Sequence, residues 1–180
     1  MALKEPWEVA PEIWPTKSAF FTFLRGNLRR AVWERWPLKI RFKNSICGKP
    51  PADYKGKAKS GAYCALSGEW VGKSAGEIDH VQGNVSLKDW DDVLPFIQHL
   101  CATEDNMQFV SKEAHKIKSY AERKGISFQE AKAEKEAIAI CKKKQDKIWL
   151  EDHGIVPATN QIRRREQIKN EILANNIPAI

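Results

Sequence analysis

An acid and a base stand side by side near the middle of this sequence. Asp79 and His80 lie near the end of the segment 77–81, which we expect to be a short strand. Because successive residues of a strand point to opposite faces, both side chains can serve one site only where the chain leaves the ladder. His115 lies one turn into a predicted helix, and Lys118 follows on the same helical face. A carboxylate and an imidazole from different elements can hold a divalent cation, and a further histidine can take a proton from water.

Each of these residues also has a simpler interpretation. Asp-His pairs occur often by chance, and a single histidine on a helix is usually a surface residue or one whose hydrogen bonds are satisfied. The ordered combination is far more specific than any of its members. It includes Asn106, whose side chain can hold the loop between the strand and the helix through bonds to the backbone.

A basic helix and a basic linker precede this centre. Apolar residues recur at three- and four-residue spacing over 16–36, where Thr16 or Ser18 can cap the start of a helix and Pro37 can end it. The segment 37–61 carries many lysines with Pro-Pro and several glycines, which is typical of a partly extended linker. Three arginines lie on the basic face of the helix: Arg25, Arg29 and Arg30.

Short strands and then helices follow the linker. The alternation of apolar residues and the turn signals predict strands at 62–66, 70–71 and 77–81. Helices are expected at 87–100, 112–124, 127–152 and 160–174. Ser127 and Glu130 form a capping-box pattern at the start of the third of these helices. The sequence therefore predicts an α+β fold, with a small β-rich centre embedded among helices.

The charge of the chain is unevenly distributed. The 180 residues carry a net charge of +7, with +10 over residues 17–59, −6 over 60–110 and +5 over 111–180. Basic flanks suit a polyanion, and an acidic centre suits a cation or chemistry on that polyanion. A basic protein with solvated lysine-rich helices fits the charge equally well. The longest apolar runs are a few residues, and the start of the chain lacks the pattern of a signal peptide, so we expect a cytoplasmic protein with no membrane partner.

The ordered combination resembles the HNH nucleases, a family of the ββα-metal (His-Me finger) class. The resemblance covers about residues 61–122. Members end a first strand with Asp-His or His-His, often with an acid two positions earlier, and Glu-Ile-Asp-His at 77–80 matches. They have a mid-loop Asn, often followed by an apolar residue and Gln, and Asn-Met-Gln at 106–108 matches. A final His or Asn nine positions after that Asn matches His115, and a Lys three further on matches Lys118.

The resemblance implies a role for each matched residue. His80 would be the general base that activates water, and Asn106 would brace the loop that orients it. Asp79 and His115 would bind one divalent metal ion, Mg²⁺ or Mn²⁺, with Ni²⁺ or Zn²⁺ as alternatives. Glu77 would support the metal ligands without binding the metal itself. Lys118 would contact a DNA phosphate. Outside the matched region, the basic helices on either side supply further expected phosphate contacts: Arg25, Arg29, Arg30, Arg163 and Arg164.

The sequence also departs from the family pattern. Many HNH domains carry two Cys-x-x-Cys pairs for a structural zinc, but the corresponding positions here are Cys-Ala-Leu-Ser at 64–67 and Ser-Lys-Glu-Ala at 111–114. One cysteine in four positions cannot hold zinc, so no structural zinc is expected. The interval between His80 and Asn106 is long for the family, and the predicted helix at 87–100 would account for it.

The sequence thus predicts a metal-dependent HNH endonuclease that cuts or nicks double-stranded DNA, of a phage-encoded or homing type, acting as a monomer or a homodimer. Residues 1–60 would form the basic helix and linker, 61–125 the nuclease motif, and 126–180 a helical extension that could bind DNA. One alternative is a DNA-binding protein that keeps the nuclease fold without catalysis. Another is an interaction protein that works through its long helices.

Overall fold

A computed structural model describes residues 3–83 and 85–175 of the chain. The chain divides into two compact units, Met1–Lys112 and Glu113–Ile180. Both helices and strands are present, which agrees with a mixed α and β fold. The N-terminal helix and linker that the sequence sets apart belong to the same unit as the strands. Within the described residues, no helix is long and apolar enough to cross a membrane.

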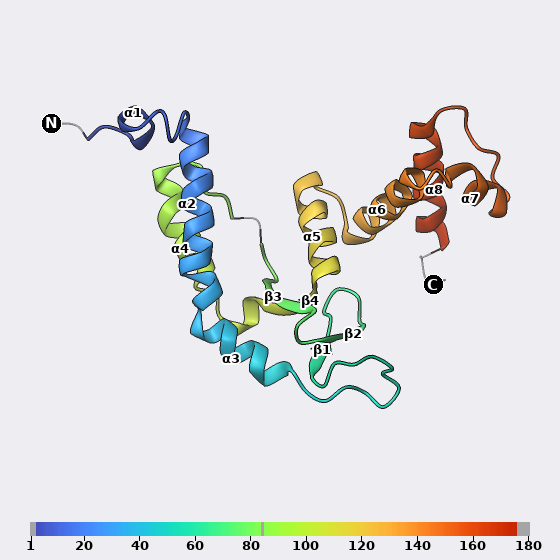
Figure 1. Cartoon of the computed structure of the whole chain (residues 1–180), viewed down its shortest axis with the longest axis horizontal. Helices are drawn as coiled ribbons and strands as arrows, with labels where there is room; N and C mark the ends of the chain where they lie inside the picture. Colours follow the sequence, from blue (N-terminus) through green and yellow to red (C-terminus); the bar gives the residue numbers. More distant parts are fainter. Residues whose placement is uncertain (1–2, 84, 176–180) are drawn as a thin grey trace. The chain divides into compact units, whose positions relative to one another are not determined.

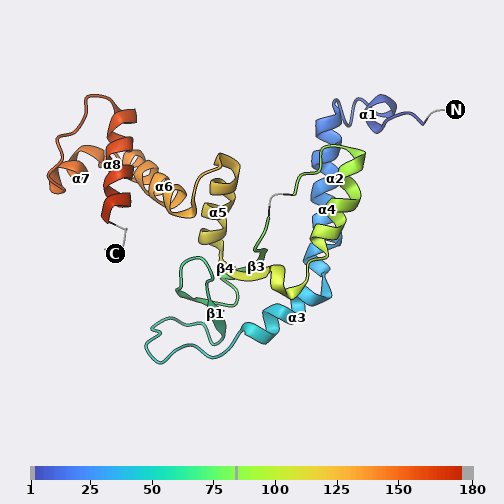
Figure 2. The ribbon, with the colours of Figure 1, turned by 180° about the vertical axis from the view of Figure 1, so that it is seen from behind.

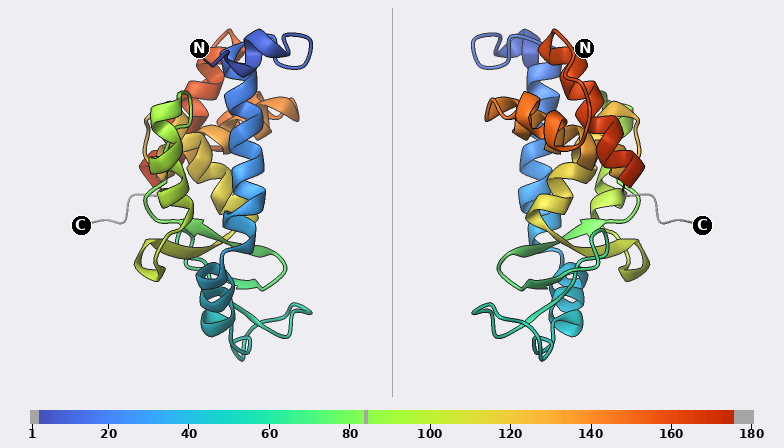
Figure 3. Two further views of the ribbon diagram at one scale, coloured as in Figure 1. Left: turned by 90° about the vertical axis from the view of Figure 1, so that its left-hand side faces the viewer. Right: turned by 90° about the vertical axis from the view of Figure 1, so that its right-hand side faces the viewer.

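The described residues of the first unit form four α-helices: α1 (Pro6–Val9), α2 (Lys17–Ala31), α3 (Pro37–Ile46) and α4 (Val93–Leu100). The predicted cap of α2 is confirmed, because the Thr16 hydroxyl accepts a bond from the Ala19 amide at 3.1 Å. In Figures 1 and 2, α2 runs beside α4. The left view of Figure 3 shows the same pairing.

The prediction of a linker directly after α2 was wrong for its first half. A 3-10 turn, η1 (Trp33–Arg35), follows α2, and Pro37 then begins α3 instead of only ending the preceding helix. Proline is well tolerated at the first helical position, since its missing N–H would have no helical partner there and its fixed φ suits the helix. Proline after a helix therefore marks a boundary without saying what lies beyond it.

The strands of the first unit form two antiparallel pairs. Strand β1 (Gly61–Tyr63) pairs with β2 (Trp70–Gly72), and β3 (Gly76–His80) pairs with β4 (Met107–Ser111). In the second pair, Asp79 faces Gln108 and His80 faces Met107. Burial alternates along β3, with Ile78 and His80 inside and Asp79 half-buried on the other face. His80 is the last residue of the ladder, so Asp79 and His80 still point to opposite faces of β3.

One hydrophobic core holds the helices and strands of the first unit together. Phe21, Phe96 and Leu100 are its largest fully buried side chains, and Ile78 brings β3 into the same cluster. Gly76 allows the close approach of β3 and β4, because a Cβ added there would lie 2.0 Å from the ring of Phe109. The core thus draws on both α2 and β3.

The second unit is helical. Its described residues include α5 (Lys112–Lys124), whose first residue still belongs to the first unit, and then α6 (Phe128–Lys142), α7 (Asp146–Asp152) and α8 (Gln161–Asn175). The predicted capping box is confirmed, since Ser127 and Glu130 bond reciprocally at the start of α6. Helices α6, α7 and α8 share a core that includes the fully buried Leu150 and Ile168. In the right view of Figure 3, α8 lies across α6.

The prediction of one helix over 127–152 was wrong at residues 143–145, which separate α6 from α7. Lys144 has a φ of 58°, in the left-handed region that ends helices. The break lets Leu150 of α7 turn back into the core beside α6. Glycine is the residue that usually adopts this backbone conformation, so the Lys-Lys-Lys-Gln sequence at 142–145 did not predict a helix end there.

Candidate functional site

His80 lies in a stack of rings inside the first unit. It is 8% exposed, and its imidazole stacks on the Trp33 indole with centroids 4.0 Å apart and on the His99 imidazole at 4.1 Å. The interplanar angles are 28° and 26°. Trp33 comes from the turn after α2 and His99 from the last turn of α4, so two packed helices hold the ring at the end of β3.

A backbone hydrogen bond fixes the orientation of the His80 ring. Its Nε2 lies 3.0 Å from the carbonyl oxygen of His99. Because a carbonyl only accepts, Nε2 carries the hydrogen in this bond, and the neutral ring then has its lone pair on Nδ1. A histidine whose tautomer is fixed in this way can accept a proton at one defined atom.

Asp79 lies on the opposite face of β3 and is positioned by Gln108. The Gln108 amide donates to Asp79 Oδ2 and to the His80 carbonyl oxygen, each at 3.2 Å. One side chain thus links the carboxylate of Asp79 to the backbone of His80 across the β3–β4 pair. The half-buried carboxylate has the oxygen-donor chemistry that divalent cations prefer.

Asn106 holds the segment that leaves β3. It ends the short 3-10 turn η3 (Glu104–Asn106), just before β4. Its Oδ1 accepts a bond from the Gln82 amide at 2.8 Å, and its carbonyl oxygen accepts one from the Val81 amide at 3.0 Å. These two bonds tie the segment directly after His80 to Asn106. Such bonds are what we expect of a residue that braces the loop. A catalytic role for Asn106 stays a prediction.

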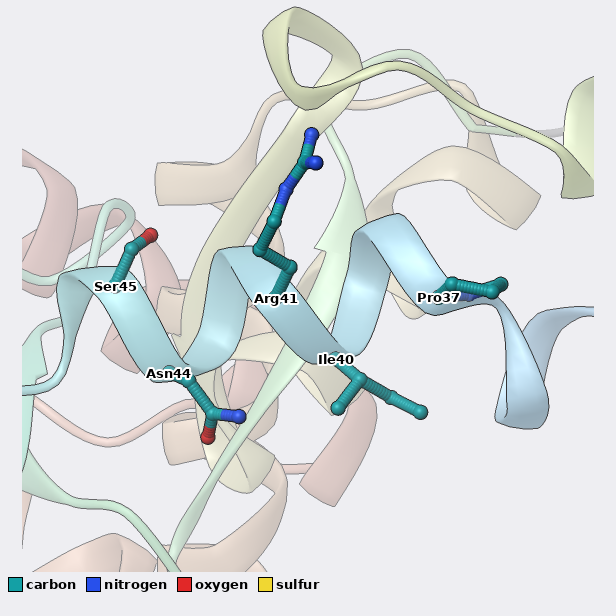
Figure 4. A pocket seen from close by; sticks show the side chains of 5 residues that line it. All are labelled: Pro37, Ile40, Arg41, Asn44 and Ser45. Carbon is teal, nitrogen blue, oxygen red and sulfur yellow. The ribbon is translucent and has the colours of Figure 1, made fainter.

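An ion pair from α3 attaches the η3 turn to the same unit. The Arg41 guanidinium donates to Glu104 Oε1 at 3.0 and 3.1 Å. Figure 4 shows Arg41 and Ser45 pointing to one side of α3, while Ile40 and Asn44 point to the other. The five residues labelled there line an open cavity of about 670 Å³ along this helix. Both members of the ion pair are largely exposed, so it orients the turn more than it stabilises the fold.

The remaining predicted site residues divide between the two units. Glu77 faces Val110 in the β3–β4 ladder. It lies near Lys43, whose pKa is lowered by burial and by the charges of Lys39 and Lys73, while Glu77 acts in the opposite direction. In the second unit, His115 stands in the first turn of α5. Lys118 pairs with Glu122 at 3.5 Å one turn further along the same helix. The structure thus brings Asp79, His80 and Asn106 into one unit and carries His115 and Lys118 on the other.

The arginines predicted to bind DNA have different environments. In the first unit, Arg25 is half-buried, the Arg29 guanidinium lies 6.0 Å from the Phe96 ring, and Arg30 donates to Asn27 Oδ1 at 2.9 Å. Arg29 and Arg30 are exposed on α2, as a phosphate contact requires.

The two predicted arginines of α8 also differ from each other. Arg163 is exposed. Arg164 is used inside the second unit, where it donates to Asp146 Oδ2 at 2.6 Å and to the carbonyl oxygens of Ala158 and Thr159 at 2.8 Å. We therefore assign Arg164 a structural role and leave it out of the DNA contacts proposed below.

Three residues of the site were missed in the sequence: Trp33, His99 and Gln108. Gln108 belongs to the motif at 106–108, but nothing in the sequence showed that it would bond Asp79. Trp33 lies at four-residue spacing from Arg29 and reads as part of the basic row. His99 ends an apolar helical pattern and has no local signal, because its contact with His80 depends on how α4 packs.

Neither a metal cluster nor a relative identifies the site. Among residues 3–83 and 85–175, no group of three or more His, Cys, Asp or Glu side chains gathers as a metal site. Comparisons with protein-family models, with curated proteins and with solved structures find no match for the chain.

Proposed function

We propose that the chain is a metal-dependent endonuclease of HNH type, which hydrolyses phosphodiester bonds of double-stranded DNA with His80 as its general base. The observation that carries the proposal is the fixed setting of His80 at the end of β3. Its ring is oriented by the His99 carbonyl, and the following segment is held by Asn106. The order β3, β4, α5 supports the same assignment, because two antiparallel strands and a helix carry the motif residues in turn.

The chemistry assigned to His80 is proton transfer. With Nε2 bonded to the His99 carbonyl, Nδ1 is the atom that takes a proton from the attacking water. The protonated ring keeps the bond to the carbonyl, because Nε2 donates in both states. The face of Trp33, 4.0 Å away, favours the positive charge that then develops on the ring.

Asp79 and His115 are the residues proposed to hold the metal ion. A carboxylate oxygen and an imidazole nitrogen form a donor set that suits Mg²⁺, Mn²⁺ and several transition ions. The bond from Gln108 restrains the Asp79 carboxylate, as outer contacts of metal ligands do. Two protein ligands leave positions for water and phosphate oxygens. A bound divalent ion supplies stabilisation of the negative charge that grows on the phosphate and the leaving oxygen.

Two observations favour a second function, a DNA-binding protein without catalysis. Asp79 and His80 point to opposite faces of β3, whereas a metal ligand and the general base must face the same phosphate. His80 is 8% exposed and lies between two rings, whereas a general base must reach a water molecule beside the substrate. In that case the stack is part of the core, and exposed basic residues such as Arg29, Arg30 and Arg163 carry out the binding. The two functions predict the same DNA affinity and differ only in turnover.

Cleavage of supercoiled plasmid with Mg²⁺, Mn²⁺, Ni²⁺ or EDTA decides between them. The wild type is compared with His80→Gln, which removes the base but keeps a side chain of similar polarity. The matched control is His153→Ala, because His153 is also stacked on a tryptophan but lies exposed in the second unit. General-base loss lowers the rate by roughly 10²–10⁴-fold, so open-circle product should disappear in His80→Gln alone.

Two outcomes would refute the assignment. Cleavage by His80→Gln at the wild-type rate would exclude His80 as the base, provided that circular dichroism shows the variant folded. No cleavage by the wild type with any metal, together with salt-dependent binding of the duplex, would select the non-catalytic function. Titration of Mn²⁺ into Asp79→Ala and His115→Ala tests the ligands separately, and unchanged affinity in either variant would remove that residue from the set.

A further inference from the structure

A basic cavity lies between α6 and α8 of the second unit. Its volume is about 400 Å³, and its walls combine cations with the apolar side chains of Ile138 and Ile162. Lys142 ends α6, Lys144 lies in the turn that follows, and Arg165 comes from the second turn of α8. Three positive charges, from α6, from the turn after it and from α8, therefore line one cavity.

No carboxylate of the described residues forms an ion pair with these three cations. Glu166, whose pKa is lowered by the bond from Lys169 and less strongly by the charge of Arg165, pairs with Lys169 instead. Neighbouring bases are paired, since Arg164 meets Asp146 at 2.6 Å and Lys169 meets Glu166 at 2.9 Å. Within the part of the chain that the structure describes, Lys142, Lys144 and Arg165 have no such partner within 4.0 Å. Three like charges that line one cavity favour an anion between them.

Lys144 occupies a backbone position that suits glycine better. Its φ of 58° is the only positive value among the described residues other than glycine. The Lys144 amide bonds to the Cys141 carbonyl at 3.0 Å, and the Gln145 amide to the Ile140 carbonyl at 3.2 Å, which closes α6 at this residue. Glycine is the usual residue at such a helix end, and a lysine there is strained. Lys144 thus combines a strained backbone conformation with a position in the wall of the cavity.

We propose that this α6–α8 cavity binds a phosphate of the DNA backbone, with Lys142, Lys144 and Arg165 as its ligands. Lysine and arginine are the usual phosphate contacts in protein–DNA complexes. The apolar walls suit the sugar beside the phosphate. A carboxylate of an acidic peptide has no such sugar beside it. Only the choice of DNA as the polyanion rests on the proposed function, because the cavity and its charges do not depend on His80.

The test compares two lysines that are adjacent in the chain. Lys144→Gly removes a cation that lines the cavity and relieves its backbone strain, so the variant should unfold at the wild-type temperature or above it. Lys143→Ala removes the same charge from an exposed neighbour that does not line the cavity. Binding of a fluorescent duplex to the full chain is measured by anisotropy in EDTA from 50 to about 300 mM salt, a range in which backbone contacts weaken steadily.

Lys144→Gly should weaken binding roughly eightfold at about 0.1 M salt, and it should lower the salt slope by about one, as expected for one lost phosphate contact. Lys143→Ala should leave the slope close to that of the wild type. Because EDTA stops cleavage, this result holds whether or not the chain is a nuclease. Conversely, plasmid cleavage by a Lys144→Gly variant with unchanged affinity would reject the cavity and leave the nuclease standing.

Three results would overturn the proposal. Equal losses in both variants would show a general charge effect. A lower unfolding temperature for Lys144→Gly would show a structural role for Lys144. Poly-glutamate tests whether the ligand is an acidic peptide. If poly-glutamate binds the wild type and binds Lys144→Gly more weakly, by the same factor as the duplex, the cavity binds an acidic peptide instead. Inorganic phosphate at constant ionic strength separates the sources of phosphate: displacement of the duplex from the wild type, but not from Lys144→Gly, would show that the cavity takes the free ion.

Discussion

Asp146→Ala should destabilise the second unit by about 3 kcal/mol, the lower end of the range for breaking a buried ion pair. The Asp146 and Arg164 side chains are only 8% and 11% exposed, and 2.6 Å separates the charged atoms. The lower end applies because Arg164 keeps its bonds to the carbonyl oxygens of Ala158 and Thr159 after Asp146 is lost. Arg164→Ala should cost more, since it removes these bonds as well and leaves the carboxylate of Asp146 buried without its partner.

Hydrogen exchange followed by mass spectrometry measures this effect in the right place. The chain has two units, so a single unfolding curve would average over both, whereas exchange of α7 and α8 peptides reports the opening of the second unit. Lys169→Ala serves as the control, because its pair with Glu166 on α8 is more exposed and should contribute about 0.5 kcal/mol or less. A cost of Asp146→Ala no larger than that of the control, or an Arg164→Ala cost smaller than that of Asp146→Ala, would refute the reasoning.

Three further predictions concern the two units. Asn106→Ala removes the bond to the Gln82 amide, and exchange at residues 81–83 should become faster while the fold remains intact, which peptide-resolved exchange can measure. Gly76→Ala places a methyl group against the ring of Phe109 and should destabilise the first unit by about 2 kcal/mol, as seen by urea unfolding; an unchanged midpoint would contradict the close packing. The bond from Arg164 lowers the pKa of Asp146, so its stabilising effect is present above the usual carboxyl range near pH 4 and is lost as the pH falls through the lowered pKa. The difference in exchange between the wild type and Asp146→Asn should therefore shrink on acidification.

The local elements of the fold could be predicted from the sequence where a side chain makes its own signal. Thr16 and Ser127 bond backbone amides within three residues, so their caps were visible as patterns. The end of α6 could not be predicted, because Lys144 adopts a positive φ that is common for glycine and unfavourable for lysine. The helix α3 was missed for a related reason: lysine-rich composition and flanking prolines outweighed the weak amphipathic pattern of 37–46.

The candidate site was only partly accessible to sequence reasoning. The positions of Asp79, His80 and Asn106 follow from motif spacing, and the bond between Asn106 and the segment after His80 agrees with that reading. The stack on His80 could not be foreseen, since Trp33 and His99 are brought to it by the packing of α2 and α4 and lie far away in the sequence. Motif spacing thus locates a site along the chain, and long-range packing determines what surrounds it.

The pairing of β3 with β4 also has a consequence for the order in which the chain folds. Their contact between His80 and Met107 encloses the segment 81–106, so joining the strands closes a loop of 26 residues. Closing a flexible loop of that length costs about 3 kcal/mol of chain entropy, beyond a constant for any loop. Packing of α4, which lies inside this loop, against α2 can offset part of that cost by shortening the flexible part of the loop. During synthesis from the N-terminus, β3 therefore emerges as an unpaired strand, and the setting of His80 is completed only after residue 111 has left the ribosome.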